Sequence, residues 1–168
     1  MHDGRFPPPF FKASLLILND SNSDTTIKFY SAEDEYGEFS NFARYSISMK
    51  GKTWPTSEHY FQAQKFVDAI YREKIRKANT PAIAARLGRA RTEKLRPDWE
   101  SVKVQVMRDA VTAKFQQHED LRAMLLSTGS AKLIEDTTDD SYWGCGSDGR
   151  GKNMLGRILM EVRATLAQ

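Results

Sequence analysis

Residues that begin and end helices divide the chain from position 55 onward. The segment 55–58 (Pro-Thr-Ser-Glu) places a hydroxyl cap before an acidic residue, and apolar side chains at three- and four-residue spacing continue that helix to Ile70. Thr80 and Pro81 cap a second helix, which stops at Gly88. Further helices are expected at 97–115, 118–127 and 153–166.

Strands are few and short. The sequence predicts them at 27–31, in a hairpin of 45–50 with 53–54, and at 131–135. A run of three prolines and a later polar stretch mark residues 1–26 as a variable N-terminal extension to one domain at 27–168. We predict an α+β fold: a mostly helical single domain with a small β-sheet or hairpin near the N-terminus.

Composition limits the class of protein further. The chain has 168 residues, of which 40% are hydrophobic, and this suits one globular domain. Cys145 is its only cysteine, which excludes an internal disulfide and suits a reducing compartment. No apolar run approaches the roughly 20 residues that span a bilayer. We expect a cytoplasmic protein with no membrane partner.

The formal net charge of +3 conceals a basic segment at 72–96, which holds nine Lys and Arg residues and two acidic ones. Such a segment attracts phosphate groups or nucleic acid, or it is simply a solvated helical face. The low overall charge argues against nucleic-acid binding as the primary function.

Two glycine motifs near the C-terminus lack the context that their chemistry requires. Residues 144–149 spell G-x-G-x-x-G, but no hydrophobic strand precedes them. Residues 146–152 fit G-x-x-x-x-G-K, yet Asn153 follows where a nucleotide-binding loop needs Ser or Thr. The glycines can still present backbone N–H groups to an anion. The three histidines show no metal-ligand spacing, so no metal site is expected.

Glu58 and Lys65 lie seven residues apart, close to two helical turns, with Gln62 between them. On one helix the two charges share a polar face. If that face lines a cavity, a buried carboxylate beside a lysine can set protonation states for catalysis. On an exposed surface the two are a remote pair without direct contact.

Two other segments carry polar groups among aromatic residues. Asp140 stands in an acidic loop that ends in Trp143 and Gly144, an arrangement that either lays a ring beside a ligand or forms a solvent-exposed turn. Asn41 follows Phe39 closely, in either a ligand-binding loop or an Asx-type turn anchored by core aromatic residues.

Four spaced blocks share one family pattern. They are Phe29-Tyr30 with Phe39-Ser40-Asn41-Phe42; residues 54–66 (WPTSEHYFQAQKF); residues 99–107 (WESVKVQVM); and Asp140-Ser141-Tyr142-Trp143-Gly144 with Gly149, Gly151, Asn153, Leu155-Gly156, Leu159-Met160 and Arg163. In these blocks the chain resembles the NADAR family, and within it the YbiA-like N-glycosidases. The resemblance covers roughly residues 27–166 without large gaps.

The resemblance implies an N-glycosidase that needs no cofactor. The implied substrates are small phosphorylated N-ribosyl compounds, the ribosylamino-pyrimidine intermediates of riboflavin biosynthesis, and the products are ribose 5-phosphate and the free pyrimidine base. Other branches of the family imply removal of ADP-ribose from guanine in DNA, which would make ADP-ribosylated nucleic acid a partner. A non-catalytic module that binds ADP-ribose or a nucleotide is the rival from another class.

Cleavage of an N-glycoside develops positive charge on the sugar, which a carboxylate near the anomeric carbon stabilises. The expected catalytic residues are therefore Glu58, which activates water, and Lys65, which tunes Glu58 or holds a ribose or phosphate oxygen. Asp140 binds ribose hydroxyls or serves as the second carboxylate. The expected substrate-binding residues are Phe39, Asn41, Trp99, Trp143, Gly144 and Asn153.

Each group of these binding residues has an expected role. Asn41 hydrogen-bonds the base or the ribose, the two tryptophans wall the pocket, and Asn153 helps to fix the glycine-rich loop. The basic segment at 72–96 and the loop at 149–153 supply cations and N–H donors to a sugar phosphate. The family pattern does not decide which carboxylate is the general base.

Overall fold

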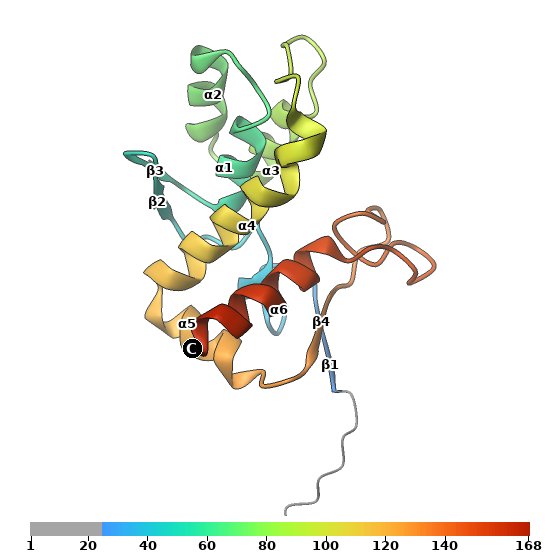
Figure 1. The fold of residues 1–168 in the computed structure, drawn as a ribbon. Coiled ribbons are helices and arrows are strands. Elements are labelled where there is room, and N and C mark those ends of the chain that lie inside the picture. The colour runs from blue at the N-terminus through green and yellow to red at the C-terminus, as the bar shows by residue number, and fades with distance from the viewer. Residues whose placement is uncertain (1–24) are drawn as a thin grey trace, which may run out of the picture.

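The computed structural model describes residues 25–168, which form a helical body with two small sheets (Figure 1). The mostly helical α+β prediction is confirmed. The strands are β1 Thr26–Phe29, β2 Ile47–Met49, β3 Lys52–Trp54 and β4 Lys132–Glu135. The helices are α1 Ser57–Ala63, α2 Ala69–Arg76, α3 Pro81–Gly88, α4 Trp99–Gln117, α5 Glu119–Ser127 and α6 Met154–Leu166, with a 3₁₀ turn at Gly37–Phe39.

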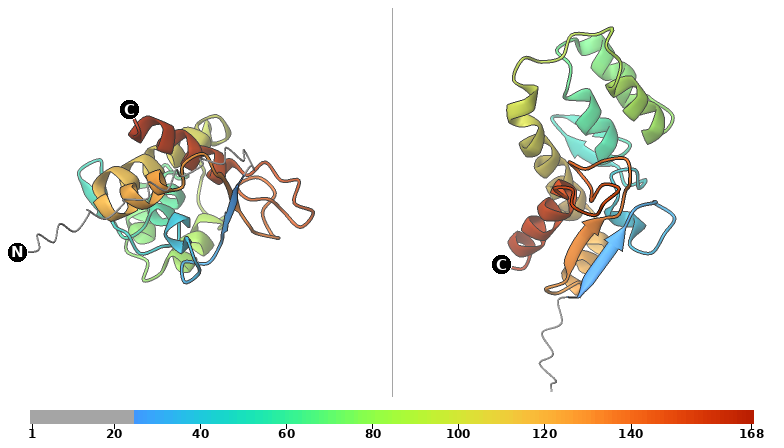
Figure 2. Two further views of the ribbon diagram at one scale, coloured as in Figure 1. Left: turned by 90° about the horizontal axis from the view of Figure 1, so that it is seen from below. Right: turned by 90° about the vertical axis from the view of Figure 1, so that its right-hand side faces the viewer.

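The two sheets differ in how far apart in the sequence their paired strands lie. β2 and β3 form the predicted antiparallel hairpin, with Ile47 opposite Trp54. β1 and β4 are far apart in sequence but lie side by side in parallel (Figure 2), and their register puts Phe29 opposite Glu135. This pairing holds the carboxyl end of β4 beside the segment that follows β1.

Side-chain caps start the first three helices. Thr56, Asp68 and Thr80 each accept a hydrogen bond from the backbone N–H three residues later, at distances up to 3.3 Å. The prediction of one helix continuing to Ile70 is wrong, because α1 ends at Ala63 and Asp68 caps a separate α2. Ile70 is consequently 82% exposed rather than part of an apolar stripe.

The long helix α4 runs through the centre of the molecule, and it contacts α1 and α6. Phe39 belongs to the adjoining core, where its ring lies 5.7 Å from Phe29 and 5.8 Å from Phe115. Lys114 of α4 is also buried and donates to the carbonyl oxygens of Glu38 and Ser40. The lysine thereby anchors the segment before Asn41. No helix within residues 25–168 is long and apolar enough to cross a membrane.

Candidate active site

A cavity of about 460 Å³ is lined by α1, the end of α3 and the loop that follows β4. Five side chains singled out from the sequence line it together: Asn41, Glu58, Lys65, Asp140 and Trp143. These residues come from three separate segments, so the fold gathers groups that the sequence only suggested belong together. Phe61, Gln62, Arg89 and Glu135 also line the cavity.

Glu58 lies in the first turn of α1 and is only 7% exposed. Its Oε1 accepts a hydrogen bond from Gln62 Nε2 at 2.6 Å, and its backbone N donates to Asn41 O at 3.2 Å. Burial raises the pKa of Glu58, whereas the Gln62 hydrogen bond and the charges of Lys65 and Arg89 lower that pKa. Burial is the largest of these effects and Asp140 adds to it, so the pKa of Glu58 lies above its ordinary value, while the Gln62 hydrogen bond orients the carboxyl group.

Lys65 lies beyond the end of α1, so a shared helical face is not what brings it to Glu58. The Lys65 Nζ atom lies 5.5 Å from the ring centroid of Phe61 and 5.9 Å from that of Trp99. Burial lowers the pKa of Lys65, and the charge of Glu58 raises it. Lys65 and Glu58 interact through charge across the cavity, without a direct hydrogen bond.

Gln62, which orients Glu58, depends on a glycine of the neighbouring helix. A Cβ atom placed on Gly88 would lie 1.8 Å from Gln62 Oε1 and 2.6 Å from its Cδ. The helix-ending glycine predicted from the sequence therefore has a second purpose, which is to leave room for the Gln62 amide. The pairing of α1 with α3 decides this purpose, and sequence spacing does not reveal it.

Aromatic rings form one wall of the site. Phe61 stands between two tryptophans, with ring centroids 5.3 Å from Trp143 and 5.1 Å from Trp99. Trp143 and Phe61 line the cavity, whereas Trp99 supports Phe61 from behind and does not line it. These rings provide flat apolar surfaces of the kind on which a nucleobase stacks.

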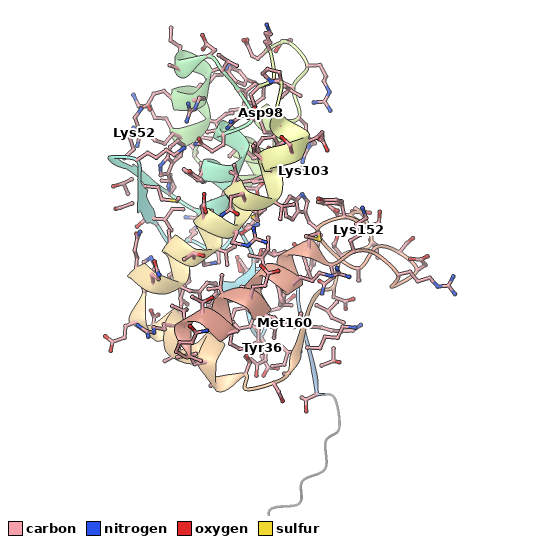
Figure 3. The ribbon with its side chains drawn as sticks, in the orientation of Figure 1. Tyr36, Lys52, Asp98, Lys103, Lys152 and Met160 are labelled. Atoms are coloured by element: carbon pink, nitrogen blue, oxygen red, sulfur yellow. The ribbon has the colours of Figure 1, made fainter. Side chains whose placement is uncertain are left out.

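Asp140 shapes the loop that carries Trp143. Its Oδ1 accepts hydrogen bonds from the backbone N–H groups of Tyr142 at 2.8 Å and Trp143 at 2.7 Å. Lys103 of α4 and Lys152 of the loop are labelled in Figure 3, and their Nζ atoms lie 4.2 and 5.0 Å from the ring centroid of Tyr142. The loop is thus fixed to α4, with Asp140 and Trp143 both at the cavity.

The glycine-rich loop does not offer the N–H donors expected for a sugar phosphate. Gly151 N donates to Cys145 O at 2.7 Å, and Asn153 N donates to Gly144 O at 3.0 Å. The N–H groups at 149, 150 and 152 also have acceptors within the chain. This expectation is corrected, because the loop consumes its own donors in folding and lies outside the cavity lining.

Three further residues predicted to bind substrate lie behind the cavity rather than on it. Phe39 is a core residue, and Gly144 is packed so closely that an added Cβ would lie 2.2 Å from Thr137 Cγ2. Asn153 donates from Nδ2 to Leu133 O at 2.8 Å. Asn153 therefore braces β4, and the roles proposed for these three residues in binding remain predictions.

Sequence reasoning missed Glu135 and gave Arg89 no individual role. Glu135 is the last residue of the predicted strand at 131–135, and an acid at a strand end was the available signal. Burial and the charges of Asp140 and Glu58 raise the pKa of Glu135 to about 7. The guanidinium of Arg89 makes no hydrogen bond or ion pair within residues 25–168, which leaves its donors available to a ligand.

Comparison with known proteins identifies the family. The model of the NADAR domain matches residues 28–167. N-glycosidase YbiA of Escherichia coli (strain K12) is 62% identical over 144 residues, which cover 86% of this chain and 90% of that protein. The NMR structure of E. coli YbiA superposes with a TM-score of 0.80 over 86% of each chain. The chain therefore belongs to the NADAR family.

A second kind of relative is longer. A riboflavin biosynthesis protein of Vibrio vulnificus is 45% identical over 142 residues, which cover 84% of this chain and 39% of that protein. The resemblance to YbiA-like N-glycosidases, found in the sequence blocks, is confirmed by these matches, and with it the assignment to an enzyme of the N-glycosidase class.

Proposed function

We propose that this enzyme hydrolyses the N-glycosidic bond of phosphorylated ribosylamino-pyrimidine intermediates of riboflavin biosynthesis, releasing ribose 5-phosphate and the free pyrimidine base. One observation carries the proposal: a single cavity combines the buried carboxyl of Glu58, the cations Lys65 and Arg89, and the ring of Trp143. A base, a ribose and a phosphate each find a complementary group there. The name of the Vibrio relative supports the link to riboflavin biosynthesis.

The reaction proceeds through a sugar that carries positive charge. As the C1′–N bond lengthens, ionised Glu58 stabilises the oxocarbenium ion and takes a proton from the attacking water. Asp140 accepts hydrogen bonds from ribose hydroxyls. Asn41 Nδ2 donates to Met107 Sδ at 3.1 Å, a weak acceptor that a substrate oxygen can replace.

Arg89 and Lys65 bind the phosphate group. A guanidinium offers paired donors that match phosphate oxygens, and an ammonium adds a point charge. This division leaves Trp143 and Phe61 for the pyrimidine ring.

A larger neighbouring hollow favours a second candidate, release of ADP-ribose from guanine in DNA. This hollow of about 750 Å³ shares Ser40, Phe42 and Glu135 with the cavity. Tyr30 and Phe42, 53% and 39% exposed, offer rings there, and Arg44 offers a cation. These groups would suit the second nucleotide half of an ADP-ribosyl substrate.

The test supplies both substrate classes to the purified protein. It is incubated with two phosphorylated ribosylamino-pyrimidines and with DNA that carries ADP-ribosylated guanine, and free ribose 5-phosphate, base and ADP-ribose are measured. Ribose 5-phosphate from the pyrimidines alone supports the first proposal. Release of ADP-ribose alone overturns it in favour of the second. Turnover of neither substrate by folded protein excludes both and favours a module that binds without cleaving.

A further inference from the structure

Glu135 carries a buried carboxyl oxygen without a partner. Its Oε2 is shielded from solvent and has no hydrogen-bond partner within residues 25–168. Glu135 also lines both the cavity and the neighbouring hollow, so the group stands where the two meet. A buried polar atom of this kind calls for an explanation, and a substrate atom in the cavity supplies one.

The backbone around Glu135 is held on several sides. Its N–H donates to Asn153 Oδ1 at 2.9 Å, and its carbonyl oxygen accepts from Cys145 N at 2.9 Å. The parallel pairing places it opposite Phe29 of β1. A Cβ on Gly156 would lie 2.5 Å from Asn153 Nδ2, so that glycine allows Asn153 to reach the strand. The fold thus fixes the backbone of Glu135, from which its carboxyl group reaches the cavity.

The charged surroundings of the two buried glutamates differ: Asp140 raises the pKa of both, but cations act on Glu58 alone. Glu58 accepts a hydrogen bond from Gln62 and feels the cations Lys65 and Arg89. Glu135 feels only negative neighbours strongly, namely Asp140 and Glu58, and both raise its pKa. Burial raises the pKa of both carboxyl groups. At Glu58 a hydrogen-bond donor and two cations oppose that rise and favour the ionised carboxylate, whereas at Glu135 the charges of Asp140 and Glu58 add to it and favour the protonated acid. The remaining charged groups on the two hollows are Glu33, Glu38, Arg44 and Asp139.

We propose that Glu135 is the general acid of this enzyme. As the C1′–N bond breaks and its electron pair moves to nitrogen, Glu135 gives its proton to that nitrogen. The water oxygen bonds to C1′, and Glu58 takes the water proton. Exchange with solvent then returns a proton to Glu135 and removes one from Glu58. The inference rests on the proposed function, because a departing pyrimidine amine requires a proton.

The first test compares kcat of the wild type and Glu135→Gln between pH 5 and 9. In the wild type, kcat should fall as the pH rises through about 7, since Glu135 then loses its proton. Glu135→Gln should lower kcat about 100-fold and abolish this alkaline decline. A loss of less than about threefold, or a lower kcat that keeps the alkaline decline, overturns the proposal.

The matched control is Glu33→Gln, which removes an exposed carboxyl from the neighbouring hollow and should leave kcat and both limbs of the profile unchanged. A carbon-13 NMR titration of the Glu135 carboxyl, assigned by its absence in Glu135→Gln, needs no substrate. A proton retained at pH 6 is expected, and an ionised Glu135 at that pH overturns the inference. A protonated Glu135 in an enzyme inactive on the pyrimidines means that only the proposed substrate is wrong.

Discussion

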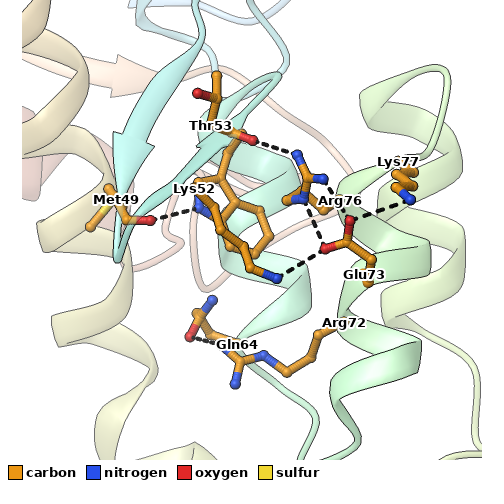
Figure 4. A network of polar contacts seen from close by, with 9 residues as sticks. Met49, Lys52, Thr53, Gln64, Arg72, Glu73, Arg76 and Lys77 are labelled. Atoms are coloured by element: carbon orange, nitrogen blue, oxygen red, sulfur yellow. Dashed lines mark hydrogen bonds and ion pairs between the residues drawn. The ribbon is translucent and has the colours of Figure 1, made fainter.

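Two groups of glutamates in this protein show how position decides what a carboxylate does. Near the surface, Glu73 of α2 contacts Arg76 at 2.5 Å and Lys52 at 3.1 Å, and hydrogen bonds from these cations lower its pKa to about 2 (Figure 4). In the cavity, burial raises the pKa of both Glu58 and Glu135. The surface carboxylate is paired and structural, whereas the raised pKa values of the buried pair suit the proton transfers that we propose for them.

Glu73 and its cations connect helix α2 to neighbouring elements of the fold. Arg76 donates to Thr53 O at 2.9 Å, so Glu73 and Arg76 tie α2 to the β2–β3 hairpin (Figure 4). Arg72 donates to Gln64 at 2.8 Å just after α1. Much of the basic segment at 72–96 is therefore used within the fold. Arg89 is the member of that segment that lines the cavity.

The largest effect on activity is expected from neutralising Glu58. Glu58→Gln should lower kcat by about 10³-fold, because the base is lost while the amide keeps the shape. Its melting temperature should not fall, since a buried charge disappears. Steady-state kinetics and thermal unfolding of one preparation check both statements. Full activity would remove Glu58 from the mechanism.

Arg89→Met, compared with Arg86→Met, tests whether the cation in the cavity binds the phosphate group. KM for the phosphorylated substrate should rise about 10- to 100-fold, the effect expected when a charged hydrogen bond is removed. Arg86→Met is the control from the same segment, and its KM should stay unchanged because Arg86 does not line the cavity. If the KM for the dephosphorylated substrate rises as much as the KM for the phosphorylated one, Arg89 does not bind the phosphate.

Lowering the pH should change the contributions of Glu135 and Glu73 to stability in opposite directions. Glu135 has a pKa of about 7 in the folded protein against a reference value of 4.5, so the folded state binds more protons between these values. Its contribution to stability therefore rises as pH falls from about 7 to 4.5, by at most about 3 kcal/mol. Denaturant unfolding at pH 7.5 and 5 should show this gain in the wild type and lose it in Glu135→Gln. Equal pH dependence in both proteins contradicts the raised pKa.

Gly88→Ala tests the support behind Glu58. The added Cβ displaces Gln62, which should cost about 1–3 kcal/mol of unfolding free energy and reduce kcat. Adding Gln62→Ala relieves the clash, so the double variant should regain stability without regaining kcat. Recovery of both would mean that the Gln62 hydrogen bond has no part in catalysis.

The smallest effect is expected at the surface. Glu73→Gln should leave kcat unchanged and lower the melting temperature slightly at low ionic strength, with the difference vanishing in high salt. The pKa of Glu73 is lowered from 4.5 to about 2, so its stabilising contribution is present above pH 4.5 and is lost as the pH falls towards 2. Melting curves at two salt concentrations and two pH values check this.

The helices and the hairpin show what sequence alone can predict here. Thr56, Thr80 and Gly88 mark helix ends through contacts with groups three or four residues away, and the β2–β3 hairpin turns at Gly51. The break after Ala63 was missed because Phe66 pairs with Leu95, a contact between distant segments. Periodicity alone treats the apolar Phe66 and Ile70 as a continuation of the helix.

The candidate site was also predicted only in part from the sequence. The sequence blocks that resemble the NADAR family include Glu58, Lys65, Asp140, Asn41 and Trp143, and all five residues line one cavity. The sequence thus determined local structure and the chemical groups of the candidate site. The tertiary structure alone decided that β1 pairs with β4, that acids alone act on Glu135, and that cations as well as Asp140 act on Glu58. A carboxyl group's protonation depends on burial and on charges from distant segments, and only the folded chain sets these.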